Sequence, residues 1–242
     1  LYRTPTKISR VRSADYLAKH QALFESGSIP VDVIIGPEQL VTKNIEQLIA
    51  NPGSLQVLDF AEGRIRLVAV KAVAGGPIVG RELQEIREHM PRVDTRVAAI
   101  FRRGGEPIIP EGGTVVEPDD EVFFIAAREH IRDVTSELRE VDKPYKRIMI
   151  AGGGNIGATL AKRLEKDYQV KVIERSYDRC RMLSDILESS IVLHGSGNEP
   201  LLLQQENIEN TDVFCALTDN DESNIMMSML AKRLGAKKAI TL

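Results

Sequence analysis

The sequence lacks the features that mark several large classes of protein. Only two of its 242 residues are cysteines, Cys180 and Cys215, and they form no C-x-x-C pair, so we expect both to be reduced. No segment approaches the roughly 20 apolar residues that a membrane-spanning helix needs. The formal net charge is -3, without the basic excess typical of nucleic-acid binders. We therefore expect a globular protein that binds no nucleic acid, does not insert into a membrane and meets one only through a partner.

Recognisable catalytic motifs are missing as well. The sequence holds no Ser-His-Asp signature, no P-loop lysine and no spacing typical of metal ligands. Its histidines, His20, His89, His130 and His194, stand in no catalytic motif. A dehydrogenase needs a group that moves a proton as hydride moves, often a histidine or a lysine. We therefore predict a binding protein rather than an enzyme, with no catalytic residue and no metal site.

Residues 1–52 predict the end of a domain. The start, Leu1-Tyr2-Arg3-Thr4-Pro5, holds neither an initiator methionine nor a signal peptide, so we expect the chain to be part of a longer protein. Lys7–Val11 is a candidate strand, and the apolar run Val31–Ile35 predicts a buried one. A helix follows from Pro37 and is stopped by Asn51-Pro52-Gly53.

Residues 53–141 have a different pattern. Arg64–Val70 alternates with period two, which predicts a strand with one face in water. Arg96–Phe101 and Glu121–Ala127 predict two more strands, Gly80–Glu88 a short helix and Arg128–Glu140 a charged amphipathic one. Glycine and proline turns separate these segments. The pattern is typical of a small α+β domain with a largely antiparallel sheet.

Residues 142–242 begin with a polar linker and then alternate between strands and helices. Nearly continuous apolar strands between amphipathic helices predict a parallel sheet covered on both faces, and right-handed crossovers make it a doubly wound Rossmann sheet. We expect strands at Arg147–Ala151, Val170–Glu174, Ile191–Leu193, Val213–Leu217 and Ala239–Leu242, and helices at Ile156–Glu165, Asp178–Glu188, Glu199–Glu206 and Ser223–Leu234. The last strand resembles Lys7–Val11, so residues 1–52 predict the end of a second copy of this domain.

The motif that carries chemistry is a glycine loop after the first of these strands. It consists of Gly152, Gly153, Gly154, Asn155, Ile156 and Gly157, a G-x-G-x-x-G pattern between a strand and a helix. Gly152 allows the tight turn, Gly154 lets the backbone approach a pyrophosphate, and Gly157 permits close packing of helix on strand. The helix that starts near Asn155 points free N–H groups at the phosphates. The loop therefore predicts a nucleotide site.

The second strand ends in a carboxylate, Glu174, 17 residues after Gly157. A carboxylate there accepts hydrogen bonds from both ribose hydroxyls and repels a 2′-phosphate, which favours NAD over NADP. Arg175 follows directly and works against this preference, because an arginine can also meet a 2′-phosphate. Glu174 does not separate NAD from ATP, ADP or S-adenosylmethionine, which share the adenosine ribose.

Two further strand ends should face the same crevice, because ligands bind beyond the carboxyl ends of parallel strands. One carries His194-Gly195-Ser196-Gly197-Asn198, and the other begins with Thr218 and Asp219. His194 keeps an oxidoreductase with a histidine base open, and the same pocket would suit an adenosyl-dependent methyltransferase. In the next helix, Met226, Met227 and Met229 predict core packing, with a subunit interface as the alternative.

Three stretches together resemble one family. They are Arg87-Glu88-His89-Met90-Pro91 running on to Phe101, Lys143-Pro144-Tyr145-Lys146-Arg147 running into the glycine loop, and Leu217-Thr218-Asp219-Asn220-Asp221-Glu222-Ser223-Asn224 running on to Ala236. They resemble the RCK family (regulator of K+ conductance), nucleotide-binding subunits of bacterial Trk potassium uptake systems. The resemblance covers nearly the whole chain. It implies two tandem units, each an RCK Rossmann domain followed by a small α+β RCK C-terminal domain.

The resemblance also implies a function and a site. The chain would hold the end of a first RCK Rossmann domain (1–52), its C-terminal domain (53–141) and most of a second Rossmann domain (142–242). It would be a cytoplasmic regulator, peripheral on the inner face of the plasma membrane. It would form a ring of two or four copies on a Trk-type potassium-translocating membrane subunit. NAD(H), or ATP and ADP, would bind the glycine loop and Glu174, with Thr218 and Asp219 beside the adenosine. Arg10 would line the matching pocket of the first copy.

Overall fold

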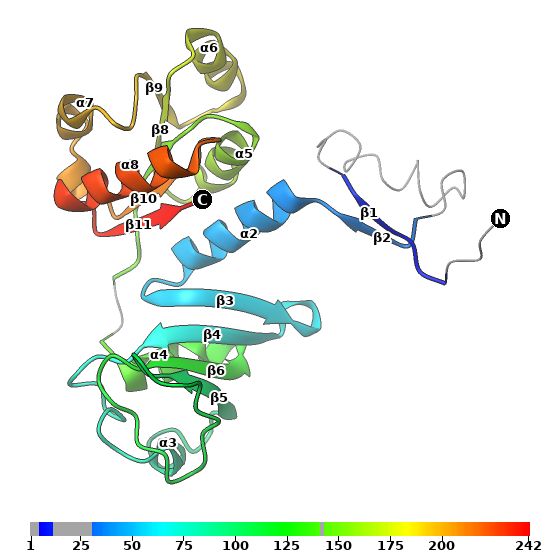
Figure 1. Ribbon diagram of the computed structural model, residues 1–242, viewed down its shortest axis with the longest axis vertical. Coiled ribbons are helices and arrows are strands. Elements are labelled where there is room, and N and C mark those ends of the chain that lie inside the picture. Colours follow the sequence, from blue (N-terminus) through cyan, green and yellow to red (C-terminus); the bar gives the residue numbers. More distant parts are fainter. Residues whose placement is uncertain (1–4, 12–30, 141–142) are drawn as a thin grey trace. The chain divides into compact units, whose positions relative to one another are not determined.

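The computed structural model describes residues 5–11, 31–140 and 143–242. The chain divides into two compact units (Figure 1). One unit comprises Leu1–Glu46 and Lys146–Leu242, and the other comprises Gln47–Tyr145.

The C-terminal part of the first unit is a five-stranded parallel sheet with helices between successive strands. Its strands, with β1 to β6 lying earlier in the chain, are β7 (Arg147–Ala151), β8 (Gln169–Glu174), β9 (Ile191–His194), β10 (Val213–Ala216) and β11 (Lys238–Thr241). Its helices are α5 (Asn155–Leu164), α6 (Tyr177–Ile186), α7 (Pro200–Gln205), α8 (Asp221–Arg233) and the 3-10 turn η5 (Ile208–Asn210). The strand order is β11-β10-β7-β8-β9, so the chain runs outward to β9, returns across β7 and continues to β11. This order confirms the predicted doubly wound Rossmann sheet.

Alternate residues of these strands pack on opposite faces of the sheet. Met149 and Ala151 of β7 join one core cluster with Leu203 of α7 and Met227 of α8. Ile150 lies between them in sequence and is fully buried on the other face, since successive strand residues point to opposite sides. Because both faces are apolar and covered, these strands show continuous apolar runs, which is why the sequence located them well.

Side-chain caps begin two of the helices that border the strand ends. Ser176 caps α6, where its hydroxyl accepts a hydrogen bond from the N–H of Arg179. Asn220 caps α8 in the same way and accepts from the N–H of Ser223 at 2.7 Å. Such caps satisfy N–H groups that have no partner within the helix, so they fix where each helix starts. The loops before α6 and α8 are therefore held in place.

Two short strands precede this sheet, β1 (Ile8–Arg10) and β2 (Val33–Ile35), followed by helix α2 (Pro37–Ala50). The strands pair in parallel, with Ile8 opposite Val33 and Arg10 opposite Ile35. Both strands and the helix were predicted, but burial of the second strand was wrong: Val33 and Ile35 are exposed. The physical reason is that an apolar strand is buried only where other elements pack on the faces of its sheet, and the pair of β1 and β2 has no such cover among the described residues.

The second unit contains a four-stranded antiparallel sheet in the order β3-β4-β6-β5. Its strands are β3 (Ser54–Phe60), β4 (Ile65–Lys71), β5 (Thr95–Phe101) and β6 (Glu121–Ala127). Short helical segments are η2 (Ala61–Gly63), η3 (Leu83–Glu85), α3 (Ile86–His89), η4 (Arg128–His130) and α4 (Ile131–Leu138). The predicted α+β domain is confirmed, although β3 was missed.

The core of the second unit lies on one face of its sheet, and this face corrects one prediction. Val68 and Val70 of β4 are buried there with Phe124 of β6. Arg66 shares their side of the strand and is 9% exposed, because its Nε atom donates to Oδ1 of Asp59 at 2.6 Å. The period-two pattern therefore predicted the strand but not which face meets water, since the arginine faces inward with a partner.

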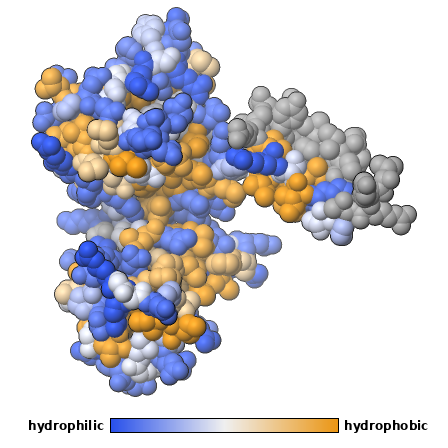
Figure 2. Space-filling model, viewed as in Figure 1, coloured by the Kyte–Doolittle hydropathy of each residue, from blue (hydrophilic) through white to orange (hydrophobic). Residues whose placement is uncertain are grey.

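Apolar side chains remain on the other face of this sheet. Phe60, Ile65 and Phe101 are exposed there, and the Phe101 ring lies 5.1 Å from the ring of Phe123. Figure 2 shows the corresponding apolar surface over these strands. Across the whole described part of the chain, no helix is long and apolar enough to span a bilayer.

Candidate functional site

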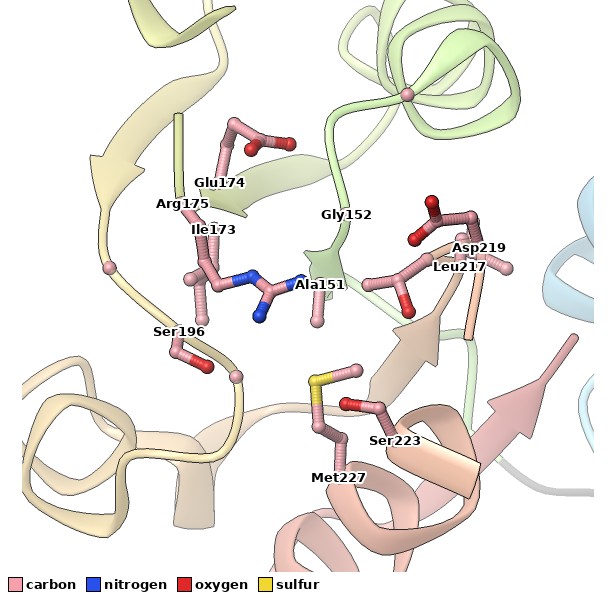
Figure 3. A pocket seen from close by; sticks show the side chains of 14 residues that line it. Ala151, Gly152, Ile173, Glu174, Arg175, Ser196, Leu217, Asp219, Ser223 and Met227 are labelled. Carbon is pink, nitrogen blue, oxygen red and sulfur yellow. The ribbon is translucent and has the colours of Figure 1, made fainter. Parts of the chain in front are cut away.

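A cavity of about 270 Å³ lies at the carboxyl ends of β7, β8, β9 and β10 (Figure 3). Its walls come from the glycine loop after β7, Glu174 at the end of β8 and Arg175 directly after it, Gly195–Gly197 after β9 and Leu217–Asp219 after β10. Ser223 and Met227 of α8 close one side. Segments far apart in sequence therefore meet at one edge of the sheet, where doubly wound folds bind ligands.

The surroundings of three loop positions explain, each in a different way, why a glycine stands there. Gly152 has φ of +109°, and a Cβ there would lie 2.8 Å from the carbonyl oxygen of Leu217. A Cβ on Gly157 would overlap the carbonyl oxygen of Gly152. Helix α5 therefore packs so closely on the loop that no side chain fits at position 157. A Cβ on Gly154 would meet no atom within 4 Å, since this residue borders the open cavity. The surroundings of Gly152 and Gly157 fit the tight turn and the close packing expected from the spacing, and the approach of a pyrophosphate to Gly154 stays a prediction.

Glu174 joins the end of β8 to the glycine loop. Its Oε2 atom accepts a hydrogen bond from the N–H of Gly153 at 2.8 Å, and its Oε1 atom accepts from the N–H of Ser176 at 2.8 Å. Each carboxylate oxygen can accept a further bond. The carboxylate is therefore fixed in position and can still accept further hydrogen bonds.

Thr218 is held by a residue that the sequence did not indicate, Asn224 of α8. The Oδ1 atom of Asn224 accepts from the Thr218 hydroxyl at 2.6 Å and from its N–H at 3.0 Å. Its Nδ2 atom donates to the carbonyl oxygens of Thr218 and Leu242. Because Asn224 is fully buried, this network fixes the cavity wall after β10. Asp219 lies beyond it, exposed at the cavity rim.

Arg179 is a second residue that was missed. From the first turn of α6, its Nε atom donates to the carbonyl oxygen of Gly153 at 2.9 Å, and its Nη2 atom lies 3.4 Å from Oδ1 of Asn155. The guanidinium therefore supports the glycine loop from outside the cavity. The available signal was its place one turn after the strand that carries Glu174, where a helical side chain can reach back.

The structure gathers some of the predicted site residues and leaves others apart. Gly152, Gly154, Glu174, Thr218 and Asp219 line the one cavity. The other loop residues, Gly153, Asn155, Ile156 and Gly157, form its support rather than its lining. Arg10 ends β1 and is not among the residues that line this cavity.

His194 lies at the end of β9 but does not line the cavity. Its Nε2 atom lies 3.0 Å from the carbonyl oxygen of Arg175, which requires a proton on that nitrogen, and its ring meets Tyr177 edge-on at 5.8 Å. The histidine therefore fixes the backbone after β8. The geometry gives no support to a proton-transfer role toward a ligand in the cavity.

Both cysteines are free, as expected, and both are buried. Burial raises the pKa of the Cys180 thiol, which donates to the carbonyl oxygen of Glu174. Burial also raises the pKa of Cys215, in the middle of β10, to about 12. Both thiols are protonated near neutral pH, and neither provides a thiolate nucleophile.

Comparison with known proteins matches both parts of this arrangement. Residues 148–242 match the TrkA-N domain, and residues 67–139 match the TrkA-C domain. Over its full length the chain is 60% identical to the Trk system potassium uptake protein TrkA of Vibrio alginolyticus, of which it covers 53%. The chain therefore spans about half the length of the curated relatives it matches.

Solved structures show the same fold at low identity. The GsuK RCK domain aligns with a TM-score of 0.58 and 16% identity, over 97% of this chain and 53% of that one. A structure described as the GsuK channel bound to NAD aligns with a TM-score of 0.57 and 15% identity, over 97% of this chain and 44% of that one.

The fold and the two matched domains define the class as an RCK protein, with a Rossmann domain and a small α+β domain. Within this class, the chain belongs to the TrkA family. The resemblance stated from the sequence is confirmed.

Proposed function

We propose that the protein is a nucleotide-binding regulatory subunit of a potassium uptake system, which gates a membrane partner that translocates K+. The observation that carries the proposal is the cavity where the glycine loop and Glu174 lie together. The identity to a Trk system potassium uptake protein supports the transport role. The NAD named for the GsuK structure supports a nucleotide as ligand.

The cavity suits a nucleotide that lies across the strand ends. The pyrophosphate would sit on the loop from Gly152 to Gly157, because the first N–H groups of α5 and its helix dipole favour an anion. Glu174 would accept the ribose hydroxyls. Thr218 and Asp219 would border the ligand from the β10 side. NAD(H) meets these demands, and ADP and ATP offer the same adenosine and phosphates.

We place residues 1–52 at the end of a first Rossmann domain, residues 53–141 in its C-terminal domain and residues 142–242 in a second Rossmann domain. The parallel pairing of β1 with β2 supports the first assignment, because parallel strands occur mainly in larger sheets covered on both faces. The exposed Ile8 and Val33 fit strands that lie inside such a sheet. Arg10, at the end of β1, would then reach the nucleotide site of that first domain.

Helix α8 supports self-association into a ring. Met226 and Met229 are 66% and 68% exposed and lie with exposed Ile225 on the outer side of the helix, whereas Met227 is 2% exposed and lines the cavity. Figure 2 shows apolar surface over this part of the molecule. Exposed methionine clusters suit interfaces that repack. The core prediction thus holds for Met227, and the interface alternative suits the other two methionines.

The same helix offers a route for regulation. A ligand beside Ser223 and Met227 contacts the inner side of α8, whose outer side would face another copy in the ring. If the nucleotide binds two ring states unequally, it shifts the balance toward one of them, typically by about 1–3 kcal/mol. The ring, on the cytosolic face of the plasma membrane, would transmit that shift to the gate of the membrane partner.

The test is isothermal titration of NADH, NAD, ADP and ATP into this protein, with Glu174→Ala and an NADH-oxidation assay beside it. Binding without oxidation, weakened by Glu174→Ala, is the expected result. Asp185→Ala is the matched control, because Asp185 is an exposed acid on α6 outside the cavity. No binding of any nucleotide, or equal affinity in wild type and Glu174→Ala, would reject the site.

The second candidate function is an NAD-dependent oxidoreductase that uses the same Rossmann pocket. It requires a proton-transfer group at the ligand, and His194 points its Nε2 atom at a backbone carbonyl instead. Steady NADH oxidation that disappears in His194→Ala would favour the enzyme over the regulator.

A further inference from the structure

Arg175 is the cationic side chain among the residues that line the cavity. Its guanidinium extends from the end of β8 into the cavity, in front of Ala151 at the end of β7 (Figure 3). Within the described part of the chain, this guanidinium makes no hydrogen bond or ion pair. Its backbone is held, since the Arg175 carbonyl accepts from His194. A fixed backbone therefore presents a charged group that has no partner among the described residues.

Two of the neighbouring charged groups are committed to the protein, and another, Asp219, is exposed at the cavity rim. Glu174 accepts from the N–H groups of Gly153 and Ser176, and Arg179 donates to the glycine loop from outside. Figure 3 shows the side chains of Glu174 and Arg175 diverging, with the carboxylate directed away from the guanidinium. Arg175 is thus not the ion-pair partner of Glu174, and an anion from a ligand would complete its contacts.

The direction of Arg175 selects between two kinds of phosphate. A 2′-phosphate would lie on the ribose, beside Glu174, and the guanidinium points away from that carboxylate. The phosphates that link or end a nucleotide would lie at the glycine loop, which starts directly after Ala151, and the guanidinium lies in front of Ala151 in the same cavity. Guanidinium groups bind phosphate oxygens in pairs of charge-assisted hydrogen bonds. The position therefore suits the phosphate chain.

The small size of the cavity favours contact between a bound nucleotide and the Arg175 guanidinium. Its volume of about 270 Å³ lies below the range of roughly 300–1,000 Å³ usual for small-molecule sites. Since the Arg175 side chain projects into this space, a bound nucleotide must share it with the guanidinium or move it aside.

We propose that Arg175 determines nucleotide specificity by binding the phosphate chain, so that the site prefers nucleotides with two or more phosphates. This inference rests on the proposed nucleotide site and adds the class of ligand that the site selects. It predicts weak binding of adenosine, stronger binding of AMP, and the strongest binding for ADP, ATP and the dinucleotide NADH.

The experiment compares wild type, Arg175→Gln, Arg175→Lys and Arg181→Gln in titrations with adenosine, AMP, ADP, ATP and NADH, each checked for unchanged thermal unfolding. Arg181 is exposed on the same helix that follows β8, outside the cavity, and controls for the loss of one positive charge. Arg175→Gln should lower the affinity for ADP, ATP and NADH by roughly 10- to 100-fold, since hydrogen bonds to charged groups contribute about 1.5–3 kcal/mol. The affinity for adenosine should not change. Arg175→Lys should recover part of the loss, because it keeps the charge without the paired geometry.

Three results would overturn the inference while leaving the nucleotide site intact. These are unchanged affinities in Arg175→Gln, an equal loss for adenosine and ADP, which would place the guanidinium on the base, and an equal loss in Arg181→Gln. If wild type binds none of the five ligands, the proposed function fails and this inference fails with it.

Discussion

The N–H of Gly153 donates a 2.8 Å hydrogen bond to Oε2 of Glu174, which ties the glycine loop after β7 to the end of β8. Replacing Glu174 with Gln keeps an acceptor for this bond and removes the charge. We expect NADH to bind more weakly, and NADPH to gain relative to NADH, because the carboxylate no longer repels a 2′-phosphate. Titration of both dinucleotides measures the ratio. A ratio equal to that of wild type would remove Glu174 from ribose recognition.

A side chain at position 154 should be compatible with folding but not with nucleotide binding. The Gly154 φ of -63° suits any residue, and a Cβ there meets no atom within 4 Å. We expect Gly154→Val to unfold at the temperature of wild type and to lose nucleotide binding, because its methyl groups would occupy the space of the pyrophosphate. Thermal unfolding and titration of one preparation test both halves. Binding at wild-type affinity would show that the phosphates lie elsewhere.

Gly157 should behave in the opposite way. A Cβ there overlaps the backbone carbonyl of Gly152, which no side-chain movement can relieve. We expect Gly157→Ala to lower the free energy of unfolding by about 1–3 kcal/mol or more. Denaturant unfolding measures the change. Gly113→Ala is the control, since a Cβ at Gly113 meets open space, and a Gly157→Ala protein as stable as this control would contradict the close packing of α5.

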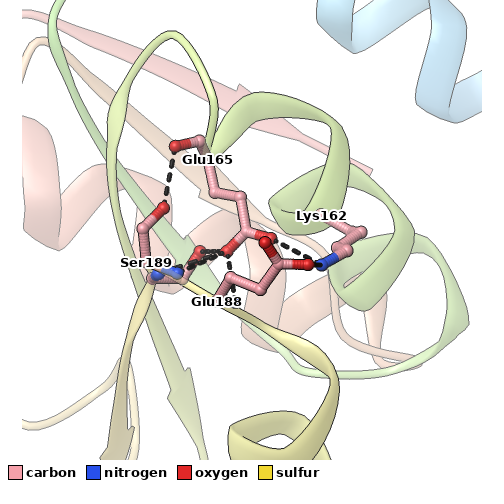
Figure 4. A network of polar contacts seen from close by, with 5 residues as sticks. Lys162, Glu165, Glu188 and Ser189 are labelled. Carbon is pink, nitrogen blue, oxygen red and sulfur yellow. Dashed lines mark hydrogen bonds and ion pairs between the residues drawn. The ribbon is translucent and has the colours of Figure 1, made fainter.

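Glu165 should make stability depend on acid pH. It lies at the end of α5 and accepts hydrogen bonds from the N–H groups of Glu188, Ser189 and Ser190, beside Lys162 (Figure 4). Burial raises its pKa, but the hydrogen bonds from Ser189 and the other donors outweigh this and lower the pKa from 4.5 to about 2. The carboxylate therefore stabilises the fold above about pH 4.5, and this contribution is lost as the pH falls toward 2.

Glu165→Gln should accordingly lower the free energy of unfolding by roughly 2–3 kcal/mol at pH 7. The difference from wild type should shrink as the pH falls below 4, which denaturant unfolding at several pH values would show. Glu188→Gln serves as control, because the Glu188 side chain is exposed and, among the described residues, pairs with Lys162 alone. A difference between wild type and Glu165→Gln that stays constant with pH would mean that ionisation of Glu165 does not stabilise the fold.

The outer side of α8 should control self-association. Met226→Glu places a charge on the exposed apolar side of the helix and should shift sedimentation toward smaller species without lowering the unfolding temperature. Met182→Glu is a matched control, since Met182 is similarly exposed but lies on α6. If both variants sediment like wild type, α8 does not form the contact between copies.

The sequence was sufficient for the Rossmann sheet and the glycine loop. β7 to β11 carry apolar residues on both faces, so continuous runs mark them, and G-x-G-x-x-G has a fixed place between strand and helix. Hydrophobic patterns in the sequence predicted the sheet of the second unit less completely, because only one face of that sheet is covered. β3 mixes polar and apolar residues, and Arg66 faces the core because Asp59, distant by one hairpin, supplies its partner.

Tertiary structure alone decided how the site is held and which charges remain available. Asn224 fixes Thr218, Arg179 supports Gly153, and Arg175 enters the cavity while Glu174 turns to the loop. A sequence motif records the backbone shape that a ligand requires, because only glycine fits there. The direction of a long side chain depends on partners from other strands and helices, and these meet only when the sheet has formed.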